Sequence, residues 1–263
     1  MSKTRRTLLM LLALALVMSP LQWLLSAMLP DGAVNPVPGC IAGMVMALLT
    51  MGLPAWFLRP WTSPRLIRQK SLASGLVMAA AAALLTRTAV TPVDAVWQKM
   101  LQITPDALPM PENPVLVLLY IVALAVVPAL MEEAFFRGAV LTGLLDGSRR
   151  STAVLVTALS FALMHGRVGN LPSLLVLSLL LTLLMLHSGH LAVPMAAHLI
   201  YNMTALSGMS LPGELALLYG VLTGLLCGWL LLRQPKIAHP PMQRWDAFIA
   251  VAAIAVLTVL YFI

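Results

Sequence analysis

Charged residues are scarce in this chain of 263 residues. Only 10% of them are charged, whereas 60% are hydrophobic. No soluble domain of this length has such a composition, so it indicates a polytopic membrane protein with little mass outside the bilayer. We therefore predict an all-α fold, in which one integral membrane domain fills residues 1–263 as a bundle of membrane helices.

Several signatures of other protein classes are missing. The chain has only two cysteines, Cys40 and Cys227, and both lie in apolar stretches. We interpret them as small packing residues, which excludes a disulfide framework or a cysteine metal pair. The sequence has no HExxH motif, no GxSxG motif and no glycine-rich phosphate-binding loop. It thus lacks the motifs of zincin metalloproteases, α/β-hydrolases and P-loop proteins.

Acidic residues are also few, with 9 Asp and Glu against 16 Lys and Arg. The basic residues cluster in short loops rather than along one face, so we expect no nucleic-acid partner. Loops that are rich in Lys and Arg are typical of the cytoplasmic side of a membrane.

About eight to nine apolar runs are long enough to be membrane spans. The first exceeds the apolar core of a signal peptide, so we expect it to stay uncleaved. The runs lie at about 7–29, 40–58, 72–90, 115–145, 151–165, 171–186, 191–206, 214–232 and 245–263.

The span count and the loop charges give the same orientation. With the N-terminus in the cytoplasm, the basic loops at 59–70, 146–150 and 233–244 all fall inside. We therefore predict a multi-pass protein of the bacterial inner membrane. The longest polar connection, at 91–113, would then lie outside and carry at most a short surface helix.

The fourth predicted span contains three charged residues, Glu132, Glu133 and Arg137. Each charge at the centre of a membrane helix costs roughly 2.5–3.5 kcal/mol, so charges there indicate function by default. Glu133 and Arg137 are four residues apart and can form an ion pair along the helix. Glu132 points about 100° away from Glu133 and has no local partner, so we predict that it is a general base. Alternatively, both carboxylates belong to a structural ion network.

Two other spans each contain a polar group that suits a hydrolytic site. His165 ends the fifth span, and His198 and Asn202 share one face of the seventh. Counted from the inner loops, Glu132 and His165 lie about 20 Å deep and His198 about 12 Å deep, so the three can meet within the bilayer. Such groups can activate water and stabilise an oxyanion.

Three motifs resemble those of the CAAX-protease and bacteriocin-processing family, also called CPBP or Abi. Glu132-Glu133-Ala-Phe-Phe-Arg137 resembles its EExxxR motif, Phe161-Ala-Leu-Met-His165 its FxxxH motif, and His198-Leu-Ile-Tyr-Asn202 its HxxxN motif. All three occur in the family's order, each in a span, within a core at about 115–207.

The resemblance implies an intramembrane endopeptidase that acts on a peptide or a membrane protein. Glu132 would activate water with help from His165, and His198 and Asn202 would stabilise the oxyanion. Glu133, Arg137 and Phe161 would support the site.

Metal dependence stays open at this point. Glu132, His165 and His198 offer enough ligands for zinc with one open position. We favour a metal-free mechanism, because Asn202 is a poor zinc ligand and a good oxyanion donor.

Three functions are compatible with the motifs. The first is a protease in peptide maturation, bacteriocin processing, immunity or membrane-protein turnover. The second is a non-catalytic scaffold or immunity protein of the same fold, which has no need for an unpaired Glu132. The third is a small transporter, which predicts inverted repeats that the sequence does not contain. The sequence predicts neither the substrate nor the oligomeric state.

Overall fold

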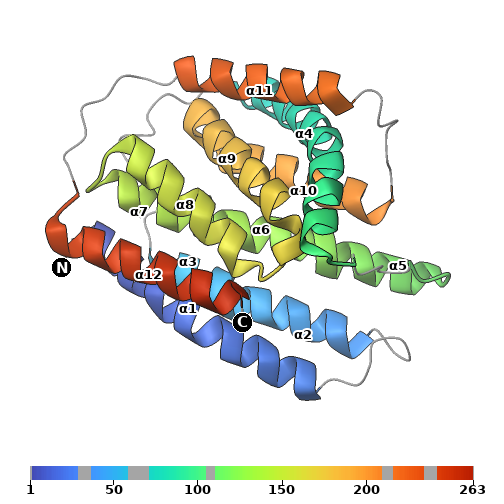
Figure 1. Cartoon of the computed structure of the whole chain (residues 1–263), viewed down its shortest axis with the longest axis horizontal. Coiled ribbons are helices and arrows are strands. Elements are labelled where there is room, and N and C mark those ends of the chain that lie inside the picture. Colours follow the sequence, from blue (N-terminus) through green and yellow to red (C-terminus); the bar gives the residue numbers. More distant parts are fainter. Residues whose placement is uncertain are drawn as a thin grey trace.

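The fold is a bundle of helices (Figure 1). A computed structural model describes residues 2–28, 37–58, 71–104, 110–208, 216–233 and 242–262. These segments are helical almost throughout, and none of them contains a β-strand. The predicted all-α class is therefore confirmed.

The helical elements include three π-helical segments, labelled η1 to η3, and one 3-10 turn, η4. In chain order the elements are α1 (Lys3–Met28), α2 (Val37–Ala47), η1 (Leu48–Gly52), α3 (Leu53–Phe57), α4 (Leu72–Leu101), α5 (Pro114–Ile121), η2 (Val122–Val126), α6 (Val127–Glu133), η3 (Ala134–Leu141), α7 (Thr142–Leu145), α8 (Arg150–Met164), η4 (Val168–Asn170), α9 (Leu171–Ser188), α10 (Ala192–Leu206), α11 (Ala216–Leu232) and α12 (Arg244–Phe262).

Four helical runs in the described part of the chain are long and apolar enough to cross a membrane. They are Val37–Phe57, Leu72–Leu101, Pro114–Leu145 and Val168–Ser188. Arg150–Met164 and Leu218–Leu232 are shorter apolar helices. The chain is thus a multi-pass membrane protein, whereas the number of eight to nine spans stays a prediction.

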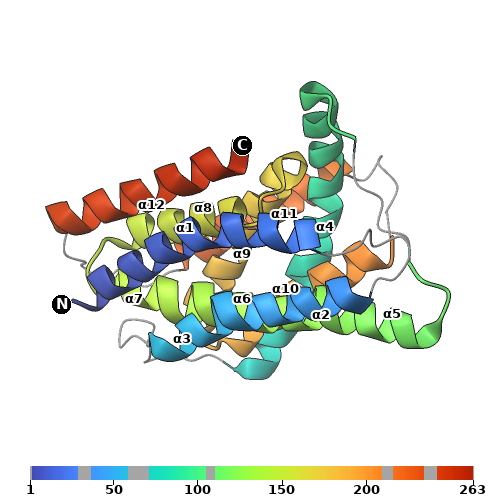
Figure 2. The ribbon, with the colours of Figure 1, turned by 90° about the horizontal axis from the view of Figure 1, so that it is seen from below.

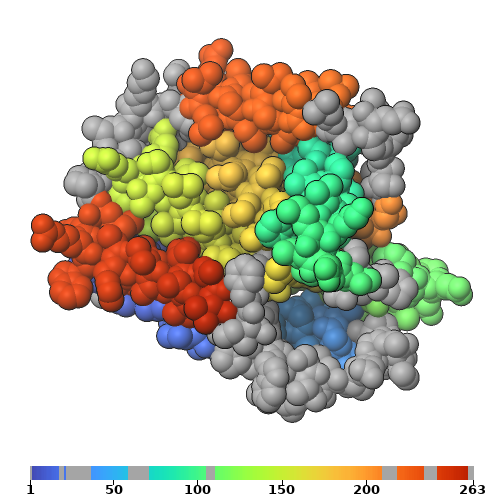
Figure 3. Space-filling model, in the orientation of Figure 1, coloured from blue at the N-terminus to red at the C-terminus, as the bar shows by residue number. Residues whose placement is uncertain are grey.

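The centre of the bundle is formed by α9 and α10. Helix α10 packs against α4, α6 and α9, and α11 lies across α4 and α9 (Figures 1 and 2). Helices α1 and α12 run side by side, and α12 also packs on α8. Figure 3 shows the face of the molecule on which α4, α8, α9, α11 and α12 lie at the surface.

The expectation of a polar connection at 91–113 is largely wrong. Helix α4 continues past Pro92 to Leu101, where Gln102 ends it in the left-handed conformation with φ 56°. Asp94, one of the polar residues that suggested a connection, is buried and accepts a hydrogen bond from the backbone N–H of Ser173. Residues 105–109 of the connection lie outside the described residues.

The long run Pro114–Leu145 passes through Pro128 without a break. A proline inside an α-helix clashes with the carbonyl group four residues earlier. Here the π-helical segment η2 lies directly before α6, whose first turn contains Pro128. The wider π turn relieves this clash, so the helix that carries both glutamates continues to Leu145.

The N-terminus of α1 is fixed to two other parts of the bundle. The Thr4 hydroxyl donates to the carbonyl of Gly143 over 2.8 Å, and Lys3 forms an ion pair of 2.8 Å with Asp146. Arg5 forms a further ion pair of 2.8 Å with Asp246 at the start of α12. The N-terminus and the turn after α7 therefore lie at one end of the bundle.

Gly143 is needed where α1 meets α7. A Cβ atom at this position would collide with the hydroxyl and the Cβ of Thr7, a buried side chain that donates to the carbonyl of Lys3. We expect Gly143→Ala to lower the free energy of unfolding by about 1–3 kcal/mol, as overpacking does. Thermal unfolding of the purified protein in detergent measures this.

The matched control is Gly228→Ala on α11, where an added Cβ has no neighbour within 4 Å. The better helix propensity of alanine should leave that variant at least as stable as wild type. An equal effect of both substitutions would contradict the close approach of α1 and α7.

Candidate active site

Three parts of the bundle supply the predicted site. The run α6–η3 carries Glu132, Glu133 and Arg137, the end of α8 carries Phe161 and His165, and α10 carries His198 and Asn202. Contacts of α10 with α6, and of α8 with η3, bring these elements together. The motifs that are separated in the sequence therefore lie in one region.

Glu133 and Arg137 form the predicted ion pair in the interior. Arg137 Nη1 donates to Glu133 Oε1 over 2.8 Å, and both side chains are 0% exposed. Arg137 Nη2 donates to both the carbonyl and the hydroxyl of Ser178 on α9, each over 2.9 Å. A buried pair of charges is tolerated only when such additional bonds satisfy it.

His198 pairs with Glu133 and not with Glu132. Its Nδ1 lies 2.9 Å from Glu133 Oε1, and both side chains are buried. The same carboxylate oxygen therefore contacts Arg137 and His198. A carboxylate at Nδ1 fixes the orientation of an imidazole ring. Glu133 thus holds the His198 ring with Nε2 as the nitrogen that does not bind the carboxylate.

Glu132 faces His165 at the edge of this buried network. His165 Nε2 lies 3.4 Å from Glu132 Oε2, and the side chains are 23% and 16% exposed. That distance is too long for a good hydrogen bond, and Oε2 has no hydrogen-bond partner. His165 Nδ1 lies 2.7 Å from the carbonyl oxygen of Phe161, which leaves Nε2 directed to the carboxylate. Glu133 Oε2 has no hydrogen-bond partner either, so the two carboxylates differ in exposure: the Glu132 side chain is 16% exposed and the Glu133 side chain is 0% exposed.

Phe161 packs between the charged groups. Its ring centre lies 4.6 Å from the Arg137 guanidinium carbon. The ring centres of His165 and His198 lie 4.5 Å and 5.7 Å from the ring centre of Phe161. Phe161 is fully buried, so it fixes both imidazoles and excludes water from the guanidinium.

Asn202 lies one turn after His198 on α10 and is half-buried. No hydrogen bond to its side chain is formed within the described part of the chain. The structure therefore shows the position of Asn202 beside His198 on α10 and no partner for its amide among the described residues.

The three side chains that the sequence offers as zinc ligands have different partners. His198 Nδ1 binds Glu133, whereas His165 Nε2 faces Glu132. Among the described residues, a search for three or more His, Cys, Asp or Glu side chains placed to hold a metal ion finds none.

Ser178 was missed by the sequence analysis. It is a buried serine within the apolar run of α9 and holds Arg137 through two acceptors. A polar residue inside a span is a signal that could have found it, since such residues often bond across helices. Nothing in the sequence indicates which helix it contacts.

The comparisons agree with the resemblance that the motifs suggested. Residues 114–204 match the family model described as type II CAAX prenyl endopeptidase Rce1-like. This segment contains Glu132, Glu133, Arg137, Phe161, His165, His198 and Asn202. No curated protein and no solved structure matches the chain. The predicted family is therefore confirmed for this part of the chain.

The buried ion pair gives a prediction about stability. Arg137→Met leaves the Glu133 carboxylate buried without its cation, which typically costs 3–5 kcal/mol. We expect a correspondingly lower free energy of unfolding, or loss of folded protein, in thermal unfolding of the detergent-solubilised protein.

Lys3→Met is the matched control, because it removes the cation of a partly exposed pair with Asp146. Such pairs contribute about 0–1 kcal/mol. If both variants lost the same stability, the buried pair would not hold the site together.

Proposed function

Because residues 114–204 match a family of CAAX prenyl endopeptidases, we propose that this chain is an intramembrane endopeptidase. It hydrolyses a peptide bond of a membrane-associated or peptide substrate through a water that Glu132 activates. One observation carries this proposal. The two adjacent glutamates have different surroundings: Glu133 is fully buried and binds Arg137 and His198, whereas Glu132 is 16% exposed beside His165.

Glu132 is the general base of the proposed reaction. A water bound to Glu132 beside His165 donates one proton to the carboxylate as its oxygen attacks the scissile carbonyl carbon. The carbonyl π bond opens and places the negative charge on oxygen. When the C–N bond breaks, Glu132 returns the proton to the leaving amine.

His198 and Asn202 are the proposed donors to the oxyanion. Both residues lie on one face of α10. His198 would donate from Nε2, and Asn202 would donate from its amide group. Donors that are fixed before the reaction stabilise the developing charge without reorganisation. Glu133 has a supporting role, since it holds the His198 ring through Nδ1.

Arg137, Ser178 and Phe161 support this arrangement from behind. Arg137 balances the charge of Glu133, and Ser178 fixes Arg137 to α9. Phe161 packs against both imidazole rings. No step of this mechanism needs a metal, which fits the separate pairing of the two histidines.

The biological setting follows from the composition and the topology. We propose that the protein lies in the bacterial inner membrane with its N-terminus in the cytoplasm. Its substrate would be a peptide or membrane protein in maturation, bacteriocin processing, immunity or turnover. A non-catalytic scaffold of the same fold is the alternative, and the experiment below separates the two.

Glu132→Gln removes the base but keeps the size of the side chain. We expect kcat to fall by at least about 10²-fold, the lower range for general-base catalysis, with little change in thermal stability. Cleavage of a membrane-peptide library by the purified protein in detergent measures this. Glu112→Gln is the matched control, because Glu112 is exposed and outside the site, and it should cleave like wild type.

The same assay with a chelator tests the metal-free mechanism. Cleavage that depends on Glu132 and persists with the chelator is the expected result. Loss of cleavage on chelation, with recovery on adding zinc, would contradict it. An unchanged cellular phenotype of Glu132→Gln would favour the scaffold.

A further inference from the structure

The last turns of α4 form a second polar cluster outside the three motifs. Asp94, Trp97 and Gln98 are spaced i, i+3 and i+4, so they lie on one face of the helix. All three contact residues 168–173, which begin two residues after His165 in the chain.

Four hydrogen bonds join α4 to this segment. Trp97 Nε1 donates to the carbonyl of Val168 over 2.9 Å, and Gln98 Nε2 donates to the carbonyl of Gly169 over 3.0 Å. The side chain of Asn170 donates to Asp94 Oδ2 over 3.1 Å, and the backbone N–H of Ser173 donates to Asp94 Oδ1 over 3.1 Å.

Asp94 thereby caps a helix to which it does not belong. The first N–H groups of a helix have no partner within it, and a carboxylate at this end is favourable for the helix dipole. Helix α9 begins at Leu171, and its own N-cap residue, Asn170, makes no side-chain cap. Asp94, which is 5% exposed, supplies the acceptor instead. The position of α9 is thus fixed to α4.

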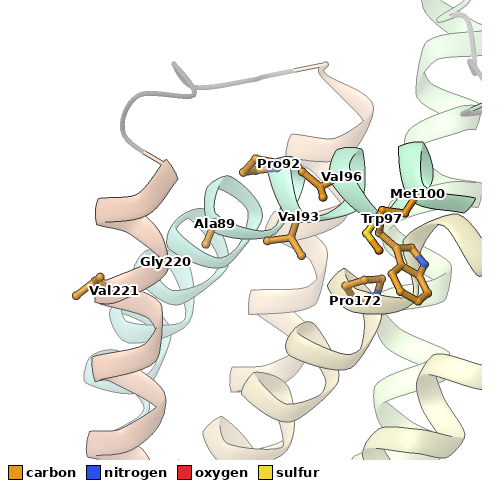
Figure 4. A pocket seen from close by; sticks show the side chains of 9 residues that line it. All are labelled: Ala89, Pro92, Val93, Val96, Trp97, Met100, Pro172, Gly220 and Val221. Carbon is orange, nitrogen blue, oxygen red and sulfur yellow. The ribbon is translucent and has the colours of Figure 1, made fainter.

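Trp97 is held on its apolar side as well. Its ring lines an apolar groove between α4, α9 and α11, and it lies next to Pro172 in Figure 4. The indole is therefore fixed by Pro172 through its ring and by Val168 through its N–H. Such a side chain transmits a displacement of α4 to the segment after His165.

The connection from this segment to His165 is short. His165 ends α8, and only Gly166 and Arg167 separate it from η4. Gly166 has a φ of 61°, so the chain turns sharply directly after the imidazole. His165 Nε2 lies 3.4 Å from Glu132 Oε2, so a small shift of the segment changes how the imidazole faces the carboxylate that would bind the water.

We propose that Asp94, Trp97 and Gln98 are positioning residues that hold His165 against Glu132 through the 168–173 segment. This inference rests on the proposed function, because it assigns them an effect on the water that Glu132 activates. They lie outside the matched segment 114–204.

Two substitutions remove one donor each and keep the bulk of the side chain. Trp97→Phe loses the indole N–H, and Gln98→Met loses the amide. A misplacement of about 1 Å can cost up to 10²-fold in rate. We expect each variant to lower kcat about tenfold, with KM within about twofold of wild type. A role in folding alone would lower the active fraction and leave kcat per folded enzyme unchanged.

The controls are Trp245→Phe on α12 and Thr91→Val on α4. Trp245 is 71% exposed, and the Thr91 hydroxyl bonds only within its own helix. Both should keep wild-type kcat.

A covalent bond can replace the hydrogen bond of Gln98. A Cβ at Gly169 would lie 3.2 Å from Gln98 Cγ, which suits a disulfide between the two positions. In a background with Cys40→Ala and Cys227→Ala, we expect Gln98→Cys/Gly169→Cys to have low kcat when reduced. Oxidation should raise kcat to at least about half of the wild-type value, and reductant should lower kcat again. The single variants should not respond to oxidation.

Amide hydrogen exchange of residues 166–173 tests the contacts without an activity assay. We expect exchange there to be about tenfold faster in Trp97→Phe and Gln98→Met than in the controls. Unchanged exchange, or an oxidised double variant that stays slow, would overturn the inference. If wild type shows no Glu132-dependent cleavage, the proposed function fails, and exchange alone then decides whether α4 holds the segment.

Discussion

The site depends on one buried oxygen, Glu133 Oε1, which contacts both Arg137 and His198. A carboxylate without water is expensive unless charges and hydrogen bonds compensate it, and these two partners come from its own helix and from α10. Ser178 adds the third helix, since it fixes Arg137 from α9. The same contacts that make the charge tolerable therefore set the relative positions of three helices.

The difference between the two glutamates follows from this constraint. Adjacent helical residues point about 100° apart, so only one of them can face the Arg137 and His198 pair. Glu132 is directed to His165, where both side chains keep some exposure. The inner glutamate holds the geometry, and the outer one stays partly exposed, which suits the role of general base that we propose for it.

The helical fold, the family and the ion pair of Glu133 with Arg137 could be predicted from the sequence, because composition and i, i+4 spacing are local properties. The pairing of His198 with Glu133 could not, since it depends on how α10 packs on α6. The end of α4 was misjudged for a similar reason. Pro92 and Asp94 suggested a loop in water, but Asp94 finds its partners at the start of α9. Whether such a polar residue is buried depends on long-range contacts, and the spacing of residues in the sequence does not show these contacts.

The π-helical segment Ala134–Leu141 begins directly after the two glutamates, and all eight of its side chains are buried. Each π turn holds one more residue than an α turn, so it rotates everything that follows by about 100°. A helical wheel drawn at 3.6 residues per turn through this run assigns Thr142 and its successors to the wrong face. Such a bulge corresponds to a one-residue insertion in a regular helix. Deletion of one residue within 134–141 would restore a regular α-helix. It would also rotate the part of the helix after the deletion, which contains α7, away from α1.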